Sequence, residues 1–229
     1  MDRVADGVYQ IKKGTRAFII DGDEGLTLID TGLPKRAEAF VEGIESIGRS
    51  VSDIGAILLT HSHADHAGNA AQLQADSGAE LYCSAADTPA VQGAEKAPTP
   101  PFLDRTPLQI LKPLFGLIPG PAPAVVDHQI QTGQGSPLPE DLVAYGSPGH
   151  TPGHVSYRLE RGGGILFVGD AALHKGGRIK RGWFNRSTPD IDQSIRHLAE
   201  LDFDVACFGH ADPITRGASA AFAAYAATL

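Results

Sequence analysis

The most constraining feature of the sequence is a cluster of histidines placed directly after a buried strand pattern. The apolar run Ala56–Leu59 is typical of a buried strand, and it leads into Thr60-His61-Ser62-His63-Ala64-Asp65-His66. In such a turn, side chains two positions apart can converge on one ion, while Asp65 and His66 can face a second. Neutral imidazoles with one carboxylate suit zinc or another borderline divalent metal. The stretch therefore predicts a metal site at a strand end, and a histidine-rich turn without a metal is the weaker alternative.

Composition favours small-molecule chemistry. The 229 residues include 19 Lys and Arg against 27 Asp and Glu, a formal charge of -8 that argues against nucleic acid or an anionic membrane as the partner. The start has no basic and apolar leader pattern, and no apolar run is long enough to span a membrane, so we expect a cytoplasmic protein. Cys83 and Cys207 stand far apart in apolar runs, which predicts buried free thiols.

Strand and helix patterns alternate in two rounds. Strands are expected at Gly7–Ile11, Ala17–Asp21, Leu26–Ile29, Ala56–Leu59, Leu81–Cys83, Leu142–Tyr145, Val155–Leu159, Ile165–Val168 and Val205–Phe208. Helices are expected from Pro34 to Gly48, around Asn69–Ser77, from Thr188 and from about Ala218, and Ser84–Asp87 has the form of a capping box. The alternation predicts one layered α/β domain over residues 1–229, with sheets inside and helices outside.

A proline-rich segment at about residues 97–126 breaks this alternation. It carries many large apolar side chains, among them Phe102, Leu111 and Phe115, so it is a poor candidate for a free linker. Three interpretations stay open: a loop packed on the domain's own surface, a lid over the active site that is lined for an apolar substrate, or a dimer contact.

Three further segments place possible metal ligands at strand ends. His150 and His154 lie in the rigid, Gly- and Pro-rich turn Ser147–His154, Asp170 follows the apolar run Ile165–Val168, and His210 follows Val205–Phe208. Each alone is weak, because a strand-terminal Asp or His is often a cap or a satisfied core group. Together with the histidine turn they indicate one site, in which a carboxylate such as Asp170 could bridge two cations.

The order of these residues, together with Asp30-Thr31-Gly32, resembles the metallo-β-lactamase superfamily over nearly the whole chain. The resemblance implies a four-layer αββα sandwich with two metals at the rim where the sheets meet. It also implies ligand sets: one metal on His61, His63 and His150, the other on Asp65, His66 and His210, with Asp170 bridging. Asp65 and Asp170 are then the expected catalytic residues. We expect His154 to orient the turn that carries His150, and Asp30 to accept a hydrogen bond from a ligand histidine.

The expected activity is hydrolysis at a carbonyl carbon of a lactone, ester, thioester or lactam. Two divalent ions, Zn²⁺ in the first place and Fe or Mn as alternatives, lower the pKa of a shared water from about 15.7 to about 7 and supply a bridging hydroxide. Asp170 argues against true β-lactamases, which commonly lack Asp there. Glyoxalase II-like thioesterases share the ligand set but typically append a C-terminal helical domain. Acyl-homoserine lactonases share it too, but they carry a tyrosine where this chain has Leu173.

Two other functions stay open. A mononuclear iron enzyme similar to persulfide dioxygenases would use His61, His150 and Asp170, and a non-catalytic metal-binding protein is a remote alternative. The expected partner is a small molecule that is apolar or carries a carboxylate, and a homodimer is an open alternative to the monomer. The carboxylate is suggested by the basic run His174–Trp183, which otherwise is a solvated loop.

Overall fold

The computed structural model describes residues 1–98, 120–130, 138–139 and 141–229. Most of the proline-rich segment lies outside the described residues, and so do its three interpretations. Among the residues that are described, no helix has the length and apolar character needed to cross a bilayer.

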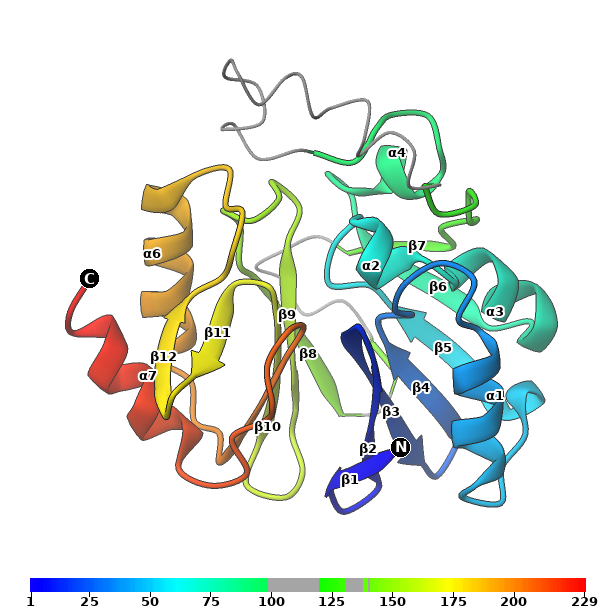
Figure 1. Ribbon diagram of the computed structural model, residues 1–229, viewed down its shortest axis with the longest axis horizontal. Coiled ribbons are helices and arrows are strands. Elements are labelled where there is room, and N and C mark those ends of the chain that lie inside the picture. Colours follow the sequence, from blue (N-terminus) through cyan, green and yellow to red (C-terminus); the bar gives the residue numbers. More distant parts are fainter. Residues whose placement is uncertain (99–119, 131–137, 140) are drawn as a thin grey trace.

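Two β-sheets form the middle of the molecule (Figure 1). The seven-stranded sheet runs in chain order through β1 (Asp2–Ala5), β2 (Val8–Lys13), β3 (Thr15–Gly22), β4 (Gly25–Ile29), β5 (Ile54–Leu58), β6 (Glu80–Ser84) and β7 (His128–Ile130). The four-stranded sheet has the order β13 (Val205–Phe208), β10 (Ile165–Gly169), β9 (Val155–Leu159) and β8 (Leu142–Gly146). A separate hairpin joins β11 (Ala172–Lys175) to β12 (Arg178–Arg181).

Helices cover the outer face of each sheet. The first sheet carries α1 (Glu38–Glu45), the 3₁₀ turn η1 (Val51–Asp53), α2 (Ala64–Ala67), α3 (Ala70–Ser77) and α4 (Thr88–Val91). The second sheet carries α6 (Thr188–Leu198) and α7 (Ala218–Ala226).

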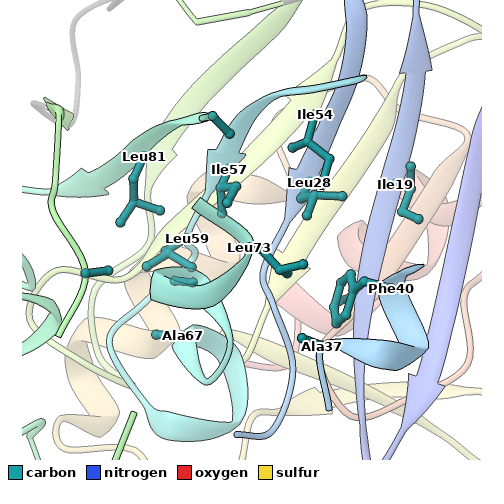
Figure 2. Close-up of a cluster of buried hydrophobic side chains, with 14 of the residues drawn as sticks. Ile19, Leu28, Ala37, Phe40, Ile54, Ile57, Leu59, Ala67, Leu73 and Leu81 are labelled. Carbon is teal, nitrogen blue, oxygen red and sulfur yellow. The ribbon is translucent and has the colours of Figure 1, made fainter. Parts of the chain in front are cut away.

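Three buried clusters correspond to the three interfaces of this layering. Side chains alternate between the two faces of a strand, so in β3 Ala17 and Ile19 pack toward the helices while Phe18 and Ile20 pack toward the second sheet. Figure 2 shows the first of these clusters, where Phe40 of α1 and Leu73 of α3 lie over Ile19 and Leu28. The clusters make the expected order of helix, sheet, sheet and helix.

Strand direction explains why the polar strand ends meet. β4, β5 and β6 are parallel, so the residues that follow them emerge at one edge of the first sheet. β10 and β13 are also parallel, and β9 is antiparallel to β10, so the turn before β9 lies at the edge where β10 and β13 end. The amide of Val155 donates to Thr60 O at 2.9 Å and joins the two edges into one rim.

Three local expectations are wrong. The first helix begins at Glu38, not Pro34, because Lys35 has a φ of 62° that a helix cannot include. The basic run is the β11–β12 hairpin, turned by Gly176 and Gly177 with positive φ, and not a loop. Only half of the capping box forms: Asp87 N donates to Ser84 Oγ, while the Asp87 carboxylate is bonded elsewhere.

Replacement of Phe40 by alanine tests the packing of the first cluster. Phe40 is 1% exposed, so Phe40→Ala should lower the free energy of unfolding by about 3–5 kcal/mol through lost burial and a cavity. Urea denaturation followed by circular dichroism measures the change. Glu42→Ala, on the exposed side of the same helix, should shift it by less than about 0.5 kcal/mol. A loss for Phe40→Ala as small as that of the control would contradict the packing.

Candidate metal centre

Three imidazole nitrogens from two turns converge at the rim. His61 Nε2 lies 3.0 Å from His63 Nδ1, and His150 Nε2 lies 2.9 Å from the same atom. His61 and His150 are buried and His63 is half-buried. The strand end after β5 supplies two of these nitrogens and the turn before β9 supplies the third, so the cluster exists only because the two sheets meet here.

A second group of donors lies beside the first. His210 Nε2 is 3.2 Å from Asp65 Oδ2 and 3.4 Å from His66 Nε2. His66 is fully buried, whereas the side chains of Asp65 and His210 are 32% and 20% exposed. The second group is therefore open to solvent on the side of Asp65.

Asp170 lies between the two groups. Its Oδ2 is 3.6 Å from His150 Nε2 and 3.1 Å from His210 Nε2, and its Oδ1 is 3.5 Å from His66 Nε2. Oδ1 is buried and has no hydrogen-bond partner among the described residues. A buried carboxylate oxygen without a partner is costly in a protein interior, so this atom is suited to a cation.

The partners on the outer side of the rings fix the tautomers. His150 Nδ1 donates to Trp183 O at 2.9 Å, and His63 Nε2 donates to Pro98 O at 2.7 Å. A carbonyl oxygen can only accept, so each of these rings carries its proton on the outer nitrogen. The inner nitrogens of His63 and His150 therefore present lone pairs to the first group.

Asp30 fixes the remaining histidines of the turn. Its Oδ2 accepts from His66 Nδ1 at 2.8 Å, as the sequence predicts, and its Oδ1 accepts from Thr60 N at 2.8 Å. Thr60 Oγ1 donates to this carboxylate and lies 3.0 Å from His61 Nδ1, from which it accepts. The inner Nε2 of His61 is thus also left as an acceptor, while the inner Nε2 of His66 points to the second group.

The donor set fits two divalent cations. Lone pairs of three imidazoles lie about 3 Å apart, an arrangement that is repulsive until a cation lies among them. Outer hydrogen bonds to carbonyl and carboxylate oxygens are the supports that metal-binding histidines normally have in proteins. Two nitrogen-rich groups that share one carboxylate match a pair of borderline metals such as zinc.

Protonation differs between the two groups. Burial, with the neighbouring histidines, lowers the pKa of His61 well below its usual value, and burial also lowers the pKa of His150 to about 4. Burial also opposes charge on His66, but Asp170 and Asp30 outweigh it and raise the pKa of His66. His61 and His150 are therefore neutral at pH 7, whereas His66, which belongs to the second group, is protonated.

The second group carries a positive charge on His210 and a negative charge on Asp65 at pH 7. Burial disfavours the charged form of His210, but hydrogen bonds with Asp170 and Asp65 raise its pKa to about 9. Burial likewise opposes ionisation of Asp65, and the hydrogen bond from His210 overcomes it and holds the pKa of Asp65 at about 2. His210 therefore holds a proton at pH 7 that a metal must displace.

His154 supports the turn that carries His150, as expected, and it also supports Asp170. Asp170 N donates to His154 Nε2 at 3.0 Å, and His154 Nδ1 donates to Ser147 Oγ at 2.8 Å. The chain continues from Ser147 to Ser156 Oγ at 2.8 Å and from there to Val168 O at 3.1 Å. Burial lowers the pKa of His154, so the neutral ring accepts at one nitrogen and donates at the other.

Asp87 is a site residue that sequence reasoning missed. It is 1% exposed, and its carboxylate accepts from Ser62 N at 2.8 Å, Thr151 Oγ1 at 2.9 Å and Gly153 N at 3.1 Å. Ser62 lies between two ligand histidines, and Thr151 follows a third. Asp87 thus joins the two turns that form the first group. The only signal in the sequence was its place after a strand, which equally predicts a helix cap.

The structure brings all seven predicted ligands to one rim, and their role as ligands stays a prediction. Three histidines lie away from this rim: His197 on α6, and His128 and His174 on strands. In the basic hairpin, Lys175 and Arg178 pair at the tip, and Arg181 binds Asp192 at 2.8 Å. Cys83 and Cys207 are buried free thiols, as predicted.

Comparison with known proteins supports the same grouping. The family model of the metallo-beta-lactamase superfamily matches residues 12–210. The uncharacterized protein YobT of Bacillus subtilis is 31% identical over 166 residues, which are 70% of this chain and 63% of YobT. The probable metallo-hydrolase YflN of the same organism is 28% identical over 203 residues, 82% of this chain and 76% of YflN.

A hydroxyacylglutathione hydrolase of Halorhodospira halophila is 31% identical over 161 residues, 69% of this chain and 47% of that protein. The chain therefore spans less than two thirds of YobT and about half of this hydrolase. Among solved structures, the Rm3 metallo-beta-lactamase superposes with a TM-score of 0.75 at 24% identity, covering 100% of this chain and 91% of that one. This likeness confirms the expected four-layer fold.

Metal binding should release protons unequally at the two groups. At pH 7 the first ion meets neutral His61 and His150, whereas the second must displace a proton from His210, whose pKa is about 9. Calorimetric titration of the metal-free protein with Zn²⁺ in buffers of different ionisation enthalpy counts the protons. We expect few protons with the first ion and at least about one with the second, whose affinity rises with pH up to about 9. Equal release by both ions would contradict the assignment.

Replacement of Asp87 by asparagine should weaken the first group selectively. An amide offers one acceptor oxygen, and its NH₂ would face donors from Ser62 or Gly153, so the two turns would separate. We expect the affinity for the first Zn²⁺ to fall about 10–100-fold in a chelator competition. Asp127→Asn is the matched control, because Asp127 also accepts a backbone amide, from Leu81, but at the opposite end of β6. A similar loss in both variants would show that Asp87 stabilises the fold alone.

Proposed function

The chain belongs to the metallo-beta-lactamase superfamily, and from this premise we propose that it is a dinuclear metal-dependent hydrolase that cleaves thioesters, esters or lactones. The observation that carries the proposal is the pair of donor groups that share Asp170, whose Oδ1 is buried without a hydrogen bond. The names of YflN, a probable metallo-hydrolase, and of the hydroxyacylglutathione hydrolase support hydrolysis as the reaction class.

The proposed ligands form two sets, although His61, His66 and Asp170 also lie close enough together to hold a cation. His61, His63 and His150 would hold one ion, and Asp65, His66 and His210 the other, with Asp170 between them. Two zinc ions at these positions would supply hydroxide at neutral pH and polarise the carbonyl oxygen of the substrate. The protein's own contribution is to orient the rings of His66, His63 and His150 through Asp30, Pro98 O and Trp183 O.

Asp65 sets the demands on the leaving group. It is the most exposed carboxylate of the site, so in the proposed reaction it would take the remaining proton from the oxygen that has added to the carbonyl carbon and pass it to the departing group. A cation bound beside Asp65 would keep its affinity for a proton low. A thiolate leaves unprotonated, whereas the amine of a lactam needs a proton. We therefore place thioesters first, reactive esters and lactones next, and β-lactams last.

Elemental analysis and a substrate panel test the proposal together. Two zinc ions, or two other redox-inert divalent ions, are expected per chain after purification. The value of kcat/KM should then fall in the order thioester, ester or lactone, and β-lactam, for substrates with the same acyl group. A single iron together with oxygen uptake on a persulfide would favour the mononuclear dioxygenase instead.

Asp170→Ala should abolish hydrolysis while the fold persists. Its carboxylate faces both donor groups, so its loss should lower kcat/KM by more than about 100-fold. Loss of a residue that only hydrogen-bonds to a metal ligand typically costs no more than about 100-fold. Thermal unfolding followed by circular dichroism shows whether the fold is retained. Asp127→Asn serves as the control for activity, and full activity of Asp170→Ala would refute the bridging role.

A further inference from the structure

Trp183 connects the two donor groups at the rim. Its carbonyl oxygen accepts from His150 Nδ1 at 2.9 Å, and its ring lies 6.1 Å from the ring of His210 with an interplanar angle of 41°. The backbone of Trp183 thus supports the first group, while its indole lies against the second. Any residue could supply the carbonyl that accepts from His150, so the hydrogen bond does not explain why a tryptophan side chain lies beside His210.

The indole is exposed at this position. Trp183 is 50% exposed and the adjacent Phe184 is 58% exposed. Among the described residues, only Met1 and Val125 are comparably exposed large apolar side chains. A large exposed aromatic side chain such as Trp183 at the edge of a polar site is typical of a surface that binds an apolar group.

The turn that carries Trp183 is fixed to both ligand-bearing segments. Gly182 N donates to Ala171 O at 3.2 Å, and a Cβ at Gly182 would lie 1.7 Å from Asp170 O, so only glycine allows this approach. Phe184 has a φ of 59°, an unfavourable value for an aromatic residue that is tolerated where neighbouring contacts impose it.

The far end of the turn is fixed to the segment before His150. Arg186 N and Ser187 N both donate to Gly149 O, at 2.8 and 3.0 Å. The side chain of Asn185 closes the turn by donating to Gly182 O at 2.8 Å. An aromatic side chain on such a backbone is held in place before a ligand arrives, which lowers the entropic cost of binding.

We propose that Trp183 determines substrate specificity, as a shelf on which a flat apolar group next to the scissile carbonyl stacks. An indole face favours planar groups in offset stacking over saturated groups of equal size. Arg178 and Lys180 are exposed on the adjoining β12, so a neutral or anionic group suits this surface better than a cation. The inference rests on the proposed function and names its substrate class: aroyl or similar unsaturated acyl compounds.

Trp183 is the only tryptophan of the chain, so its fluorescence reports on the shelf directly. The zinc-loaded full-length protein is titrated with benzoate and with cyclohexanecarboxylate, which match in charge and carbon number but differ in flatness. We expect benzoate to change the emission of Trp183 and to bind about threefold to tenfold more tightly than cyclohexanecarboxylate by calorimetry.

Three variants separate stacking from general packing. Trp183→Leu should remove the preference for benzoate, Trp183→Phe should keep part of it, and both should keep the zinc content because the carbonyl to His150 remains. The matched control is Tyr145→Leu, which removes an aromatic ring at the same 6.1 Å distance from a histidine that is not a predicted ligand, His197. This control should leave the preference unchanged.

Equal affinities for the two carboxylates, an unchanged preference in Trp183→Leu, or no response of Trp183 emission to benzoate would each overturn the inference. Turnover of benzoyl and cyclohexanecarbonyl thioesters distinguishes it from the proposed function. If neither thioester is hydrolysed while the binding preference depends on Trp183, the hydrolase fails and the shelf stands. If both are hydrolysed at equal kcat/KM and the carboxylates bind equally, the shelf fails and the hydrolase stands.

Discussion

The convergence of unprotonated imidazole nitrogens at the rim is the constraint on which the rest of the structure depends. Such nitrogens repel one another and their burial is unfavourable, so the fold must hold them in place before a cation compensates them. The supports lie on the outer side of the rings. The Asp30 carboxylate and the carbonyls of Pro98 and Trp183 accept hydrogen bonds from the outer nitrogens of His66, His63 and His150. The ligand geometry is therefore a property of the supports as much as of the histidines.

Two buried carboxylates divide this supporting role. Asp30 fixes the histidine turn internally through Thr60 and His66, whereas Asp87 fixes it to the turn that carries His150. His154 adds the third fixed point by accepting from the amide of Asp170. These contacts link both sheets, so the site has the rigidity of the interface between the sheets and not that of a loop. The hydrophobic clusters on either side supply the stability that such a polar rim requires.

Asymmetry between the donor groups connects the structure to the chemistry proposed. In the first group His61 and His150 are buried and neutral, while in the second Asp65 and His210 are more exposed and form a charged pair. The indole of Trp183 also lies on this second side. In the proposed reaction, substrates are then selected in two ways. The leaving group is selected by whether it needs a proton, and the acyl group is selected by whether it is flat enough to stack on Trp183.

The sequence by itself determined which side chains could serve as metal ligands and which strands they follow. Apolar runs before His61, Asp170 and His210 predicted correctly which residues would meet, because parallel strands bring their ends to one edge. The sequence could not reveal that Asp87 joins two turns, that His154 holds Asp170, or that Pro98 and Trp183 set the tautomers. Only the tertiary structure decided these, since every residue has a carbonyl and an amide, and which of them meet depends on the packing of distant segments. The basic hairpin was missed for a related reason: its strands are short. The first buries Ala172 and Leu173 and the second buries only Ile179 among charged residues, so no periodic pattern marks them.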